Sequence, residues 1–315
     1  MSIIEQAARR LEELRRSGID VSGGARGTSA TPGAGGAAAH LPAKAPVDRS
    51  GRPLVIREAS IPAPRGDSSN KGSRQVNIDL VRLAGMGYLT PETPRARIAD
   101  EFRVIKRPLL SNVNKRAASS VERSQLIMVT SSLPGEGKTF VSVNLAISLA
   151  MELDTTVLLV DADVSRSSVL KRLGLPSAPG LLDLLTNPSL GMTEVLLRTN
   201  IEKLSLLPAG KPHGRATELL ASDSMTRLLD DLASRYSDRI IVFDAPPLLP
   251  STESRVLATQ MGQVVVVVEA ERTPKKFLEQ ALATIDSCPL VLPLLNKISR
   301  SEVGTYYGYY DPTEA

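Results

Sequence analysis

The sequence predicts an α/β fold in which a mostly parallel sheet is flanked by helices and preceded by a helical and flexible N-terminal arm. Two observations predict it. From residue 125 onward, short apolar runs alternate with helical patterns, and strands separated by helices usually pair in parallel with both faces covered. A Gly-rich stretch also stands between one such run and a long helical pattern. We therefore divide the 315 residues into an N-terminal helix (1–17), a linker (18–75), a main domain (76–300) and a C-terminal tail (301–315).

The N-terminal arm combines a short amphipathic helix with the linker. Residues 2–17 place apolar side chains on one stripe, and Glu5 and Arg9 have the i,i+4 spacing of a helical ion pair. A helix this short is marginal alone, so we expect it to dock on its own domain or on a partner. Residues 18–75 are rich in Gly, Ala, Ser and Pro without periodicity, which is typical of a flexible linker. The arm is more basic than the rest, so weak attraction to an anionic membrane surface stays open.

The main domain begins with NIDLVRLAGMGYLT, where order is expected to resume, and with a helix in RIADEFRVIKRPLL that Pro108 is expected to stop. A strand is predicted at 126–130 and a helix at 139–153. Further apolar runs predict strands at 157–160, 204–207, 240–243, 264–269 and 291–295. Helical patterns separate several of them, at 216–236 and 274–286. Pro293 counts against the last strand, because proline cannot donate to a sheet ladder.

Composition excludes several classes of function. Aromatic residues make up 3% and Trp is absent, whereas single-stranded nucleic acid is read by aromatic stacking, so no nucleic-acid partner is expected. One cysteine, Cys288, excludes an internal disulfide framework and a cysteine-based zinc site. The longest apolar run, Val264–Val268, is far shorter than the roughly 18 residues that span a bilayer, and residues 1–18 lack a secretory apolar region. We expect a cytoplasmic protein.

The stretch SLPGEGKT at 132–139 is the central motif. It has the spacing of a P-loop, with Ser132 at the position usually held by Gly, and it lies between a predicted strand and a helix. Its backbone N–H groups would form an anion site at a helix N-terminus, Lys138 would reach the β- and γ-phosphates, and the Thr139 hydroxyl would bind Mg²⁺. We therefore expect a P-loop NTPase fold that binds ATP and Mg²⁺. The expected nucleotide-binding residues are Pro134, Gly135, Glu136, Gly137, Lys138, Thr139 and Phe140.

Two carboxylate motifs follow predicted strands. VLLV at 157–160 leads into Asp161 and Asp163, and IIVF at 240–243 leads into Asp244. Ligands bind at the carboxyl ends of parallel strands, and Asp244 has the Walker B position that holds Mg²⁺. Asp161 and Asp163 together would supply a further metal ligand and the base that orients an attacking hydroxyl, with the assignment between them open. The expected metal ligands are Thr139, Asp161 and Asp244, and the expected catalytic residues are Lys138, Asp161 and Asp163.

Four of the six tyrosines crowd into the tail, and phosphoryl transfer needs an in-line hydroxyl acceptor. A Tyr-rich C-terminal strand without a catalytic role is the alternative. The candidate acceptors are Tyr306, Tyr307, Tyr309 and Tyr310.

With these motifs together, the sequence resembles the bacterial tyrosine kinases of exopolysaccharide synthesis, and most closely the exosortase-associated tyrosine autokinases. The resemblance rests on SSLPGEGKT, VLLVDAD, IIVFDAPP and the tyrosine cluster, and also on GLLDLL, LLPAGK, TELLAS and ADEFRVIKRPLL. It implies an ATP-dependent tyrosine autokinase that regulates polysaccharide polymerisation and export. One subunit would phosphorylate the tail tyrosines of its neighbour.

The resemblance also implies partners. These are a membrane adaptor of the chain-length-determinant type as a separate polypeptide, a tyrosine phosphatase, and further copies of the chain in a ring-like homo-oligomer held at the inner membrane through the adaptor. The family's oligomerisation motif, Glu-x-x-Arg-x-x-Arg, corresponds to Asp100, Arg103 and Lys106, and lysine cannot reproduce arginine's bidentate fork. A second departure is Ser165 where the family commonly has arginine, with Arg166 following.

Two other functions stay open. A partitioning or positioning ATPase of the same superfamily would hydrolyse ATP without forming phosphotyrosine. Such ATPases carry a lysine where this chain has Leu133, which favours the kinase. A non-enzymatic, nucleotide-sensing scaffold would not need the full set of catalytic residues.

Overall fold

The computed structural model describes residues 73–94, 96–114, 122–235 and 239–299, all within the compact unit Gly66–Ala315. The predicted N-terminal helix and the tyrosine-rich tail therefore lie outside the described residues. Among those described, none of the helices combines the length and the apolar character that crossing a membrane requires.

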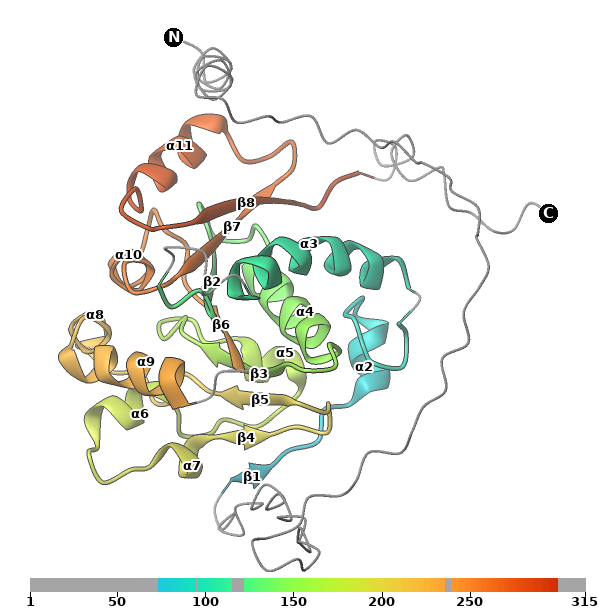
Figure 1. Ribbon diagram of the computed structural model, residues 1–315. Coiled ribbons are helices and arrows are strands. Elements are labelled where there is room, and N and C mark those ends of the chain that lie inside the picture. The colour runs from blue at the N-terminus through green and yellow to red at the C-terminus, as the bar shows by residue number, and fades with distance from the viewer. Residues whose placement is uncertain (1–72, 95, 115–121, 236–238, 300–315) are drawn as a thin grey trace, which may run out of the picture. The chain divides into compact units, whose positions relative to one another are not determined.

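The described elements form one eight-stranded sheet with helices between the strands (Figure 1). Its order is β1-β4-β5-β3-β6-β2-β7-β8. The strands are β1 (Arg74–Gln75), β2 (Leu126–Ser131), β3 (Thr156–Asp161), β4 (Leu197–Arg198), β5 (Leu204–Leu207), β6 (Arg239–Asp244), β7 (Gln263–Glu269) and β8 (Val291–Asn296). Only β4 and β5 pair antiparallel, so the mostly parallel α/β sheet expected from the sequence is confirmed.

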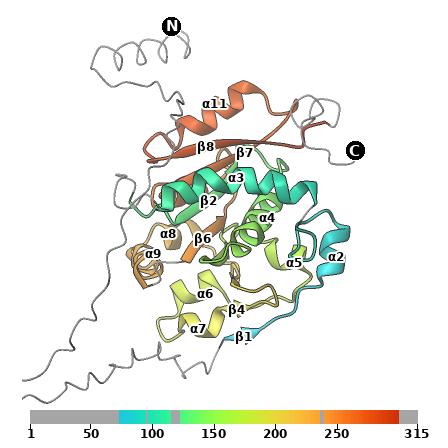
Figure 2. The same cartoon turned by 45° about the vertical axis from the view of Figure 1, so that its right-hand side comes forward.

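Helices cover both faces of the sheet. The helices are α2 (Leu80–Gly85), α3 (Arg97–Asn114), α4 (Lys138–Ala150), α5 (Val169–Leu173), α6 (Leu181–Thr186), α7 (Met192–Val195), α8 (Ala216–Leu220), α9 (Asp223–Arg235), α10 (Thr252–Ala258) and α11 (Lys275–Ala283). One apolar core joins α2–α5 to one face, and a second joins α6–α11 to the other. Alternation along β2 explains the division, because Ile127 and Val129 belong to the first core and Leu126 and Met128 to the second. Figure 2 shows α3 lying alongside α4 on the first face.

The predicted end of α3 at Pro108 is wrong, because the helix continues to Asn114. Proline removes one backbone donor and leaves the carbonyl of Val104, four residues back, without its helical partner. That residue is exposed, so water can satisfy the carbonyl. The following turn is held by burial of Leu109 and by a hydrogen bond of 3.2 Å from Gln263 Nε2 to the Leu109 carbonyl. Tertiary packing thus outweighs the local effect of proline.

Two helix boundaries also differ from the sequence pattern. The pattern at 216–236 forms two helices, α8 and α9, because Ser222 between them accepts a bond from the Met225 N–H and donates to the Leu219 carbonyl. Helix α4 ends at Ala150 instead of 153, because Lys203 Nζ donates to the carbonyls of Glu152 and Leu153 at 2.9 and 2.8 Å.

The ends of the sheet add two details. Strand β8 forms despite Pro293, because it is the edge strand of the sheet among the described residues, where it pairs with β7 alone. Strand β1 consists of the last two residues of the predicted linker, and it pairs with β4.

Candidate phosphate and magnesium site

The Gly-rich loop joins β2 to α4 at the carboxyl edge of the sheet, as a P-loop requires. Gly135 and Gly137 have φ of 92° and 102°, the left-handed region that glycine tolerates best. A Cβ on Gly137 would clash with Asn296 Nδ2, so a side chain here would adopt a strained backbone conformation and would displace the Asn296 amide. The turn then directs the chain into α4, whose first residue is Lys138.

The ends of β7 and β8 brace this loop, a feature that the sequence analysis did not find. Asn296 Nδ2 donates to the Glu136 carbonyl at 2.9 Å, and Lys297 Nζ donates to the Gly135 carbonyl at 2.7 Å. The Glu136 side chain, 2% exposed, accepts from the Leu133 N–H at 2.7 Å and from the Thr273 hydroxyl. The Glu136 side chain therefore stabilises the loop through contacts within the protein and not through contact with a nucleotide.

Two carboxylates lie side by side where β3 and β6 end. Asp161 and Asp244 are register partners on these adjacent strands, and both are buried. Asp161 Oδ2 accepts from Ser167 Oγ and from two backbone N–H groups at the start of α5, at 3.0–3.1 Å. Asp244 Oδ1 accepts from Ser142 Oγ at 3.0 Å. The second oxygen of each, Asp161 Oδ1 and Asp244 Oδ2, is buried without a hydrogen-bond partner.

The electrostatics of this pair favour a cation. Burial, followed by the charge of Asp244, raises the pKa of Asp161 to about 7. Burial also raises the pKa of Asp244, against the opposing effects of Lys138 and of the Thr139 and Ser142 hydroxyls. Unsatisfied buried carboxylate oxygens are costly unless protonated or bound to a cation.

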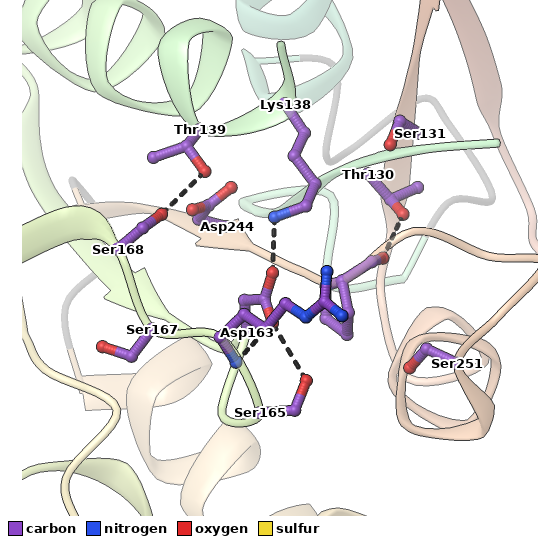
Figure 3. A network of polar contacts seen from close by, with 12 residues as sticks. Thr130, Ser131, Lys138, Thr139, Asp163, Ser165, Ser167, Ser168, Asp244 and Ser251 are labelled. Carbon is purple, nitrogen blue, oxygen red and sulfur yellow. Dashed lines mark hydrogen bonds and ion pairs between the residues drawn. The ribbon is translucent and has the colours of Figure 1, made fainter. Parts of the chain in front are cut away.

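The donor set fits Mg²⁺. Asp161 and Asp244 each have one unpartnered carboxylate oxygen, and the Thr139 hydroxyl contacts Asp244. Mg²⁺ in nucleotide sites usually takes one or two carboxylates plus phosphate and water oxygens. Within the described ranges, no group of three or more His, Cys, Asp or Glu side chains is arranged to hold a metal alone. Ser168 Oγ, 3.2 Å from Thr139 Oγ1, is a neighbour that the sequence did not single out (Figure 3).

Lys138 and Asp163 form a largely buried ion pair. Figure 3 shows Lys138 Nζ directed at Asp163. The distance from Nζ to Asp163 Oδ2 is 2.6 Å, and the two side chains are 13% and 5% exposed. Asp163 Oδ1 accepts from the Arg166 N–H at 3.1 Å and from Ser165 Oγ at 3.3 Å. The two aspartates of the motif thus differ, because both oxygens of Asp163 are partnered whereas one oxygen of Asp161 is not.

A cavity of about 620 Å³ opens on this pair. It is lined by Pro134, Gly135, Lys138, Asp163, Ser165, Arg166, Ser168, Arg172, Pro246, Pro247, Pro250, Ser251 and Glu253. Asp163 lines this space, whereas Asp161 and Asp244 are buried and do not line it. A ligand in the cavity therefore meets the phosphate loop on one side and Asp163 on the other.

The remaining predicted site residues are dispersed. Phe140 packs against Tyr88 with ring centroids 4.9 Å apart, so it supports α4. Asp100 and Arg103 pair with each other on the exposed face of α3. Lys106 points inward, where its Nζ donates to the Ser148 carbonyl at 2.6 Å and pairs with Glu152 at 2.8 Å. The four tail tyrosines, Tyr306, Tyr307, Tyr309 and Tyr310, lie outside the described residues.

The fold and the loop define a P-loop nucleotide-binding protein, and a family model described as an AAA domain matches residues 124–292, more than half of the chain. The tyrosine-protein kinase ptk of Acinetobacter johnsonii is 34% identical over 189 residues, which are 59% of this chain and 25% of that protein. The putative tyrosine-protein kinase CapB of Staphylococcus aureus is 28% identical over 70% of this chain and 92% of that protein. The crystal structure of the chimerical protein CapA2B2 has 29% identity, a TM-score of 0.56, and coverage of 70% and 92%.

The chain thus spans about a quarter of the Acinetobacter relative and about nine-tenths of the Staphylococcus relative. It belongs to the AAA domain family and, within it, to the bacterial tyrosine kinases. Its assignment to the exosortase-associated subgroup stays a prediction.

Proposed function

We propose that this protein is an ATP-dependent protein-tyrosine autokinase that regulates exopolysaccharide polymerisation and export, and that it phosphorylates the tail tyrosines of a neighbouring copy. The observation that carries the proposal is the pairing of Lys138 with Asp163 beside an open cavity. A phosphate ligand and a proton acceptor are thus within one hydrogen bond of each other. Relatives named as tyrosine-protein kinases support the same activity.

The nucleotide phosphates would be held by the loop N–H groups and by Lys138. Thr139, Asp161 and Asp244 would hold Mg²⁺, which when bound offsets phosphate charge. When Lys138 turns to a phosphate, it releases Asp163 Oδ2 from the 2.6 Å ion pair. Asp163 is then a carboxylate facing the cavity with one oxygen available.

The transfer itself needs one acceptor and one proton. A tyrosine Oη attacks the γ-phosphorus in line, the bond to the β–γ bridging oxygen breaks, and ADP leaves. Asp163 takes the phenolic proton. We assign it this role because it lines the cavity, whereas Asp161 does not line it and is held by three hydrogen bonds at the start of α5.

The proposed assembly follows from the family. A separate membrane adaptor of the chain-length-determinant type would hold the kinase at the cytoplasmic side of the inner membrane, copies of the chain would form a ring, and a phosphatase would reverse the modification. Asp100 and Arg103 support a role in the ring, since both are exposed on α3. Lys106 is committed to an intramolecular pair, so we leave it out of the proposed interface.

Mass spectrometry of the purified full chain with ATP, Mg²⁺ and the adaptor's cytoplasmic tail tests the function. We expect phosphotyrosine at Tyr306, Tyr307, Tyr309 or Tyr310, its loss in Lys138→Met, and no loss in the control Lys171→Met. ATP hydrolysis without phosphotyrosine in the unaltered chain would instead identify a positioning ATPase. Absence of both activities would favour the scaffold.

A further inference from the structure

Two arginines border the cavity on the side of the proposed proton acceptor. Arg166 and Arg172 lie in the segment from the end of β3 through α5, both are exposed, and both line the cavity with Lys138 and Asp163. In the part of the chain that the structure describes, no carboxylate forms an ion pair with either guanidinium. Burial raises the pKa of Tyr88, and the positive charge of Arg172 partly opposes this shift.

The charges around this space do not balance. The charged lining residues are Lys138, Arg166, Arg172, Asp163 and Glu253. Lys138 and Asp163 neutralise each other, and Glu253 accepts a hydrogen bond of 2.8 Å from Ser251 Oγ. The Glu253 carboxylate keeps its charge, so the lining carries one net positive charge, and its two guanidinium groups have no carboxylate partner among the described residues.

The nucleotide does not require these groups. The loop N–H groups, Lys138 and the proposed Mg²⁺ ligands already serve the phosphates. Both arginines follow Asp163 along the chain and line the same cavity as Asp163. Guanidinium groups in such a position suit a second, carboxylate-bearing ligand, because their planar forks match carboxylate geometry.

The chain itself contains a segment with the matching charge. Residues 301–315 carry Glu302, Asp311 and Glu314 and have no Lys or Arg, although the whole chain has a net charge of +4. Asp311 directly follows Tyr310. The acidic residues thus lie on both sides of the tyrosine cluster, where a site that binds the tyrosine would meet them.

We propose that Arg166 and Arg172 form a subsite for carboxylates that flank the accepting tyrosine, so that the enzyme's substrate class is an acidic tyrosine peptide. The inference rests on the proposed kinase function and adds a specificity determinant to it. It also gives Arg166 a role: its N–H orients Asp163, and its side chain binds the acceptor.

A binding assay tests the subsite without requiring catalysis. The protein is the full chain with its four tail tyrosines changed to phenylalanine, saturated with ADP and Mg²⁺. The probes are a fluorescent peptide of residues 301–315 and its neutral form with Glu302→Gln, Asp311→Asn and Glu314→Gln. Anisotropy at low salt should show about tenfold tighter binding of the acidic peptide, as expected for two or three partly exposed ion pairs. The preference should shrink in 0.5 M salt.

Variants then assign the preference. The double change Arg166→Gln with Arg172→Gln should remove it and leave ADP affinity unchanged. The control Arg227→Gln, an exposed arginine on α9 outside the cavity lining, should keep it. The subsite is refuted if the preference survives the double change, if neither peptide binds, or if the double change weakens ADP alone. The kinase function is judged separately, by phosphotyrosine in the unaltered chain.

Discussion

The buried carboxylates of Asp161 and Asp244 lead to a testable prediction about stability. Burial makes their charged forms costly in the folded chain unless surrounding groups offset the charge. The change is Asp161→Asn in the full chain without nucleotide or metal. Asparagine keeps an oxygen that can accept the three hydrogen bonds at the start of α5. Its amide can donate to Asp244 across the register pair, so the substitution removes a buried charge with little loss of contacts.

The magnitude follows from the pKa of Asp161, which is 3.8 for an unperturbed aspartate and about 7 in the folded chain. Because the folded state binds the proton more tightly, the contribution of Asp161 to stability is complete below pH 4 and is lost as the pH rises through 7. Between pH 5 and pH 8 the loss amounts to about 2.5 kcal/mol. The variant should therefore gain roughly that much in free energy of unfolding, relative to the unaltered chain, over this interval.

Urea denaturation at pH 5 and pH 8 measures the difference. Asp154→Asn, which changes an exposed carboxylate in the turn after α4, is the matched control and should show no such gain. Adding Mg²⁺ with a non-hydrolysable ATP analogue should stabilise the unaltered chain more than the variant, because the bound cation offsets the charge that the variant lacks. An Asp161→Asn variant that is destabilised equally at both pH values would refute the reasoning.

Three further predictions concern the loop and α3. Gly137→Ala should weaken binding of a fluorescent ATP analogue at least tenfold, since its Cβ would lie 2.2 Å from Asn296 Nδ2 in a backbone with positive φ; unchanged affinity would contradict the geometry. Asn296→Ala, which removes the bond to the Glu136 carbonyl, should weaken the same binding about threefold to tenfold with less than about 1 kcal/mol lost in urea unfolding. Lys106→Met should cost about 2 kcal/mol at pH 7, and Arg107→Met, 3.8 Å from the same Glu152 but 63% exposed, less than about 0.5 kcal/mol. Since the Lys106 hydrogen bond lowers the pKa of Glu152, the Lys106 effect should fade as the pH falls through the folded-state value, below 4.5.

Features that depend on neighbouring residues could be predicted from the sequence. Glycine spacing between a strand and a helix is sufficient to predict the phosphate loop, and β-branched runs that end in aspartate are sufficient to predict β3 and β6 with their carboxylates. The sequence pattern could not predict that Asp161 and Asp244 are register partners, because the order of the strands depends on how both layers of helices pack on the sheet. The different partners of Asp161 and Asp163 also depend on the turn that follows them.

Features built by distant segments could not be predicted. Asn296 reaches the loop across 160 positions of sequence, and no local pattern marks its role. The continuation of α3 past Pro108 similarly depends on Gln263, which belongs to β7. Lys106 has the spacing of an oligomerisation motif, but the position of α4 decides that its ammonium group turns inward.

The contacts of Lys106 link the proposed ring surface to the phosphate site. Asp100 and Arg103 are exposed on α3, and Lys106 fixes that helix to the Ser148 carbonyl and Glu152 at the C-terminal end of α4. The opposite end of α4 begins with Lys138. An interface formed on the exposed residues of α3 would therefore lie next to the helix whose first residue, Lys138, we propose to bind phosphate. Subunit contact on α3 and nucleotide contact at the start of α4 would then be connected through Lys106, whether or not Lys106 touches a neighbouring subunit.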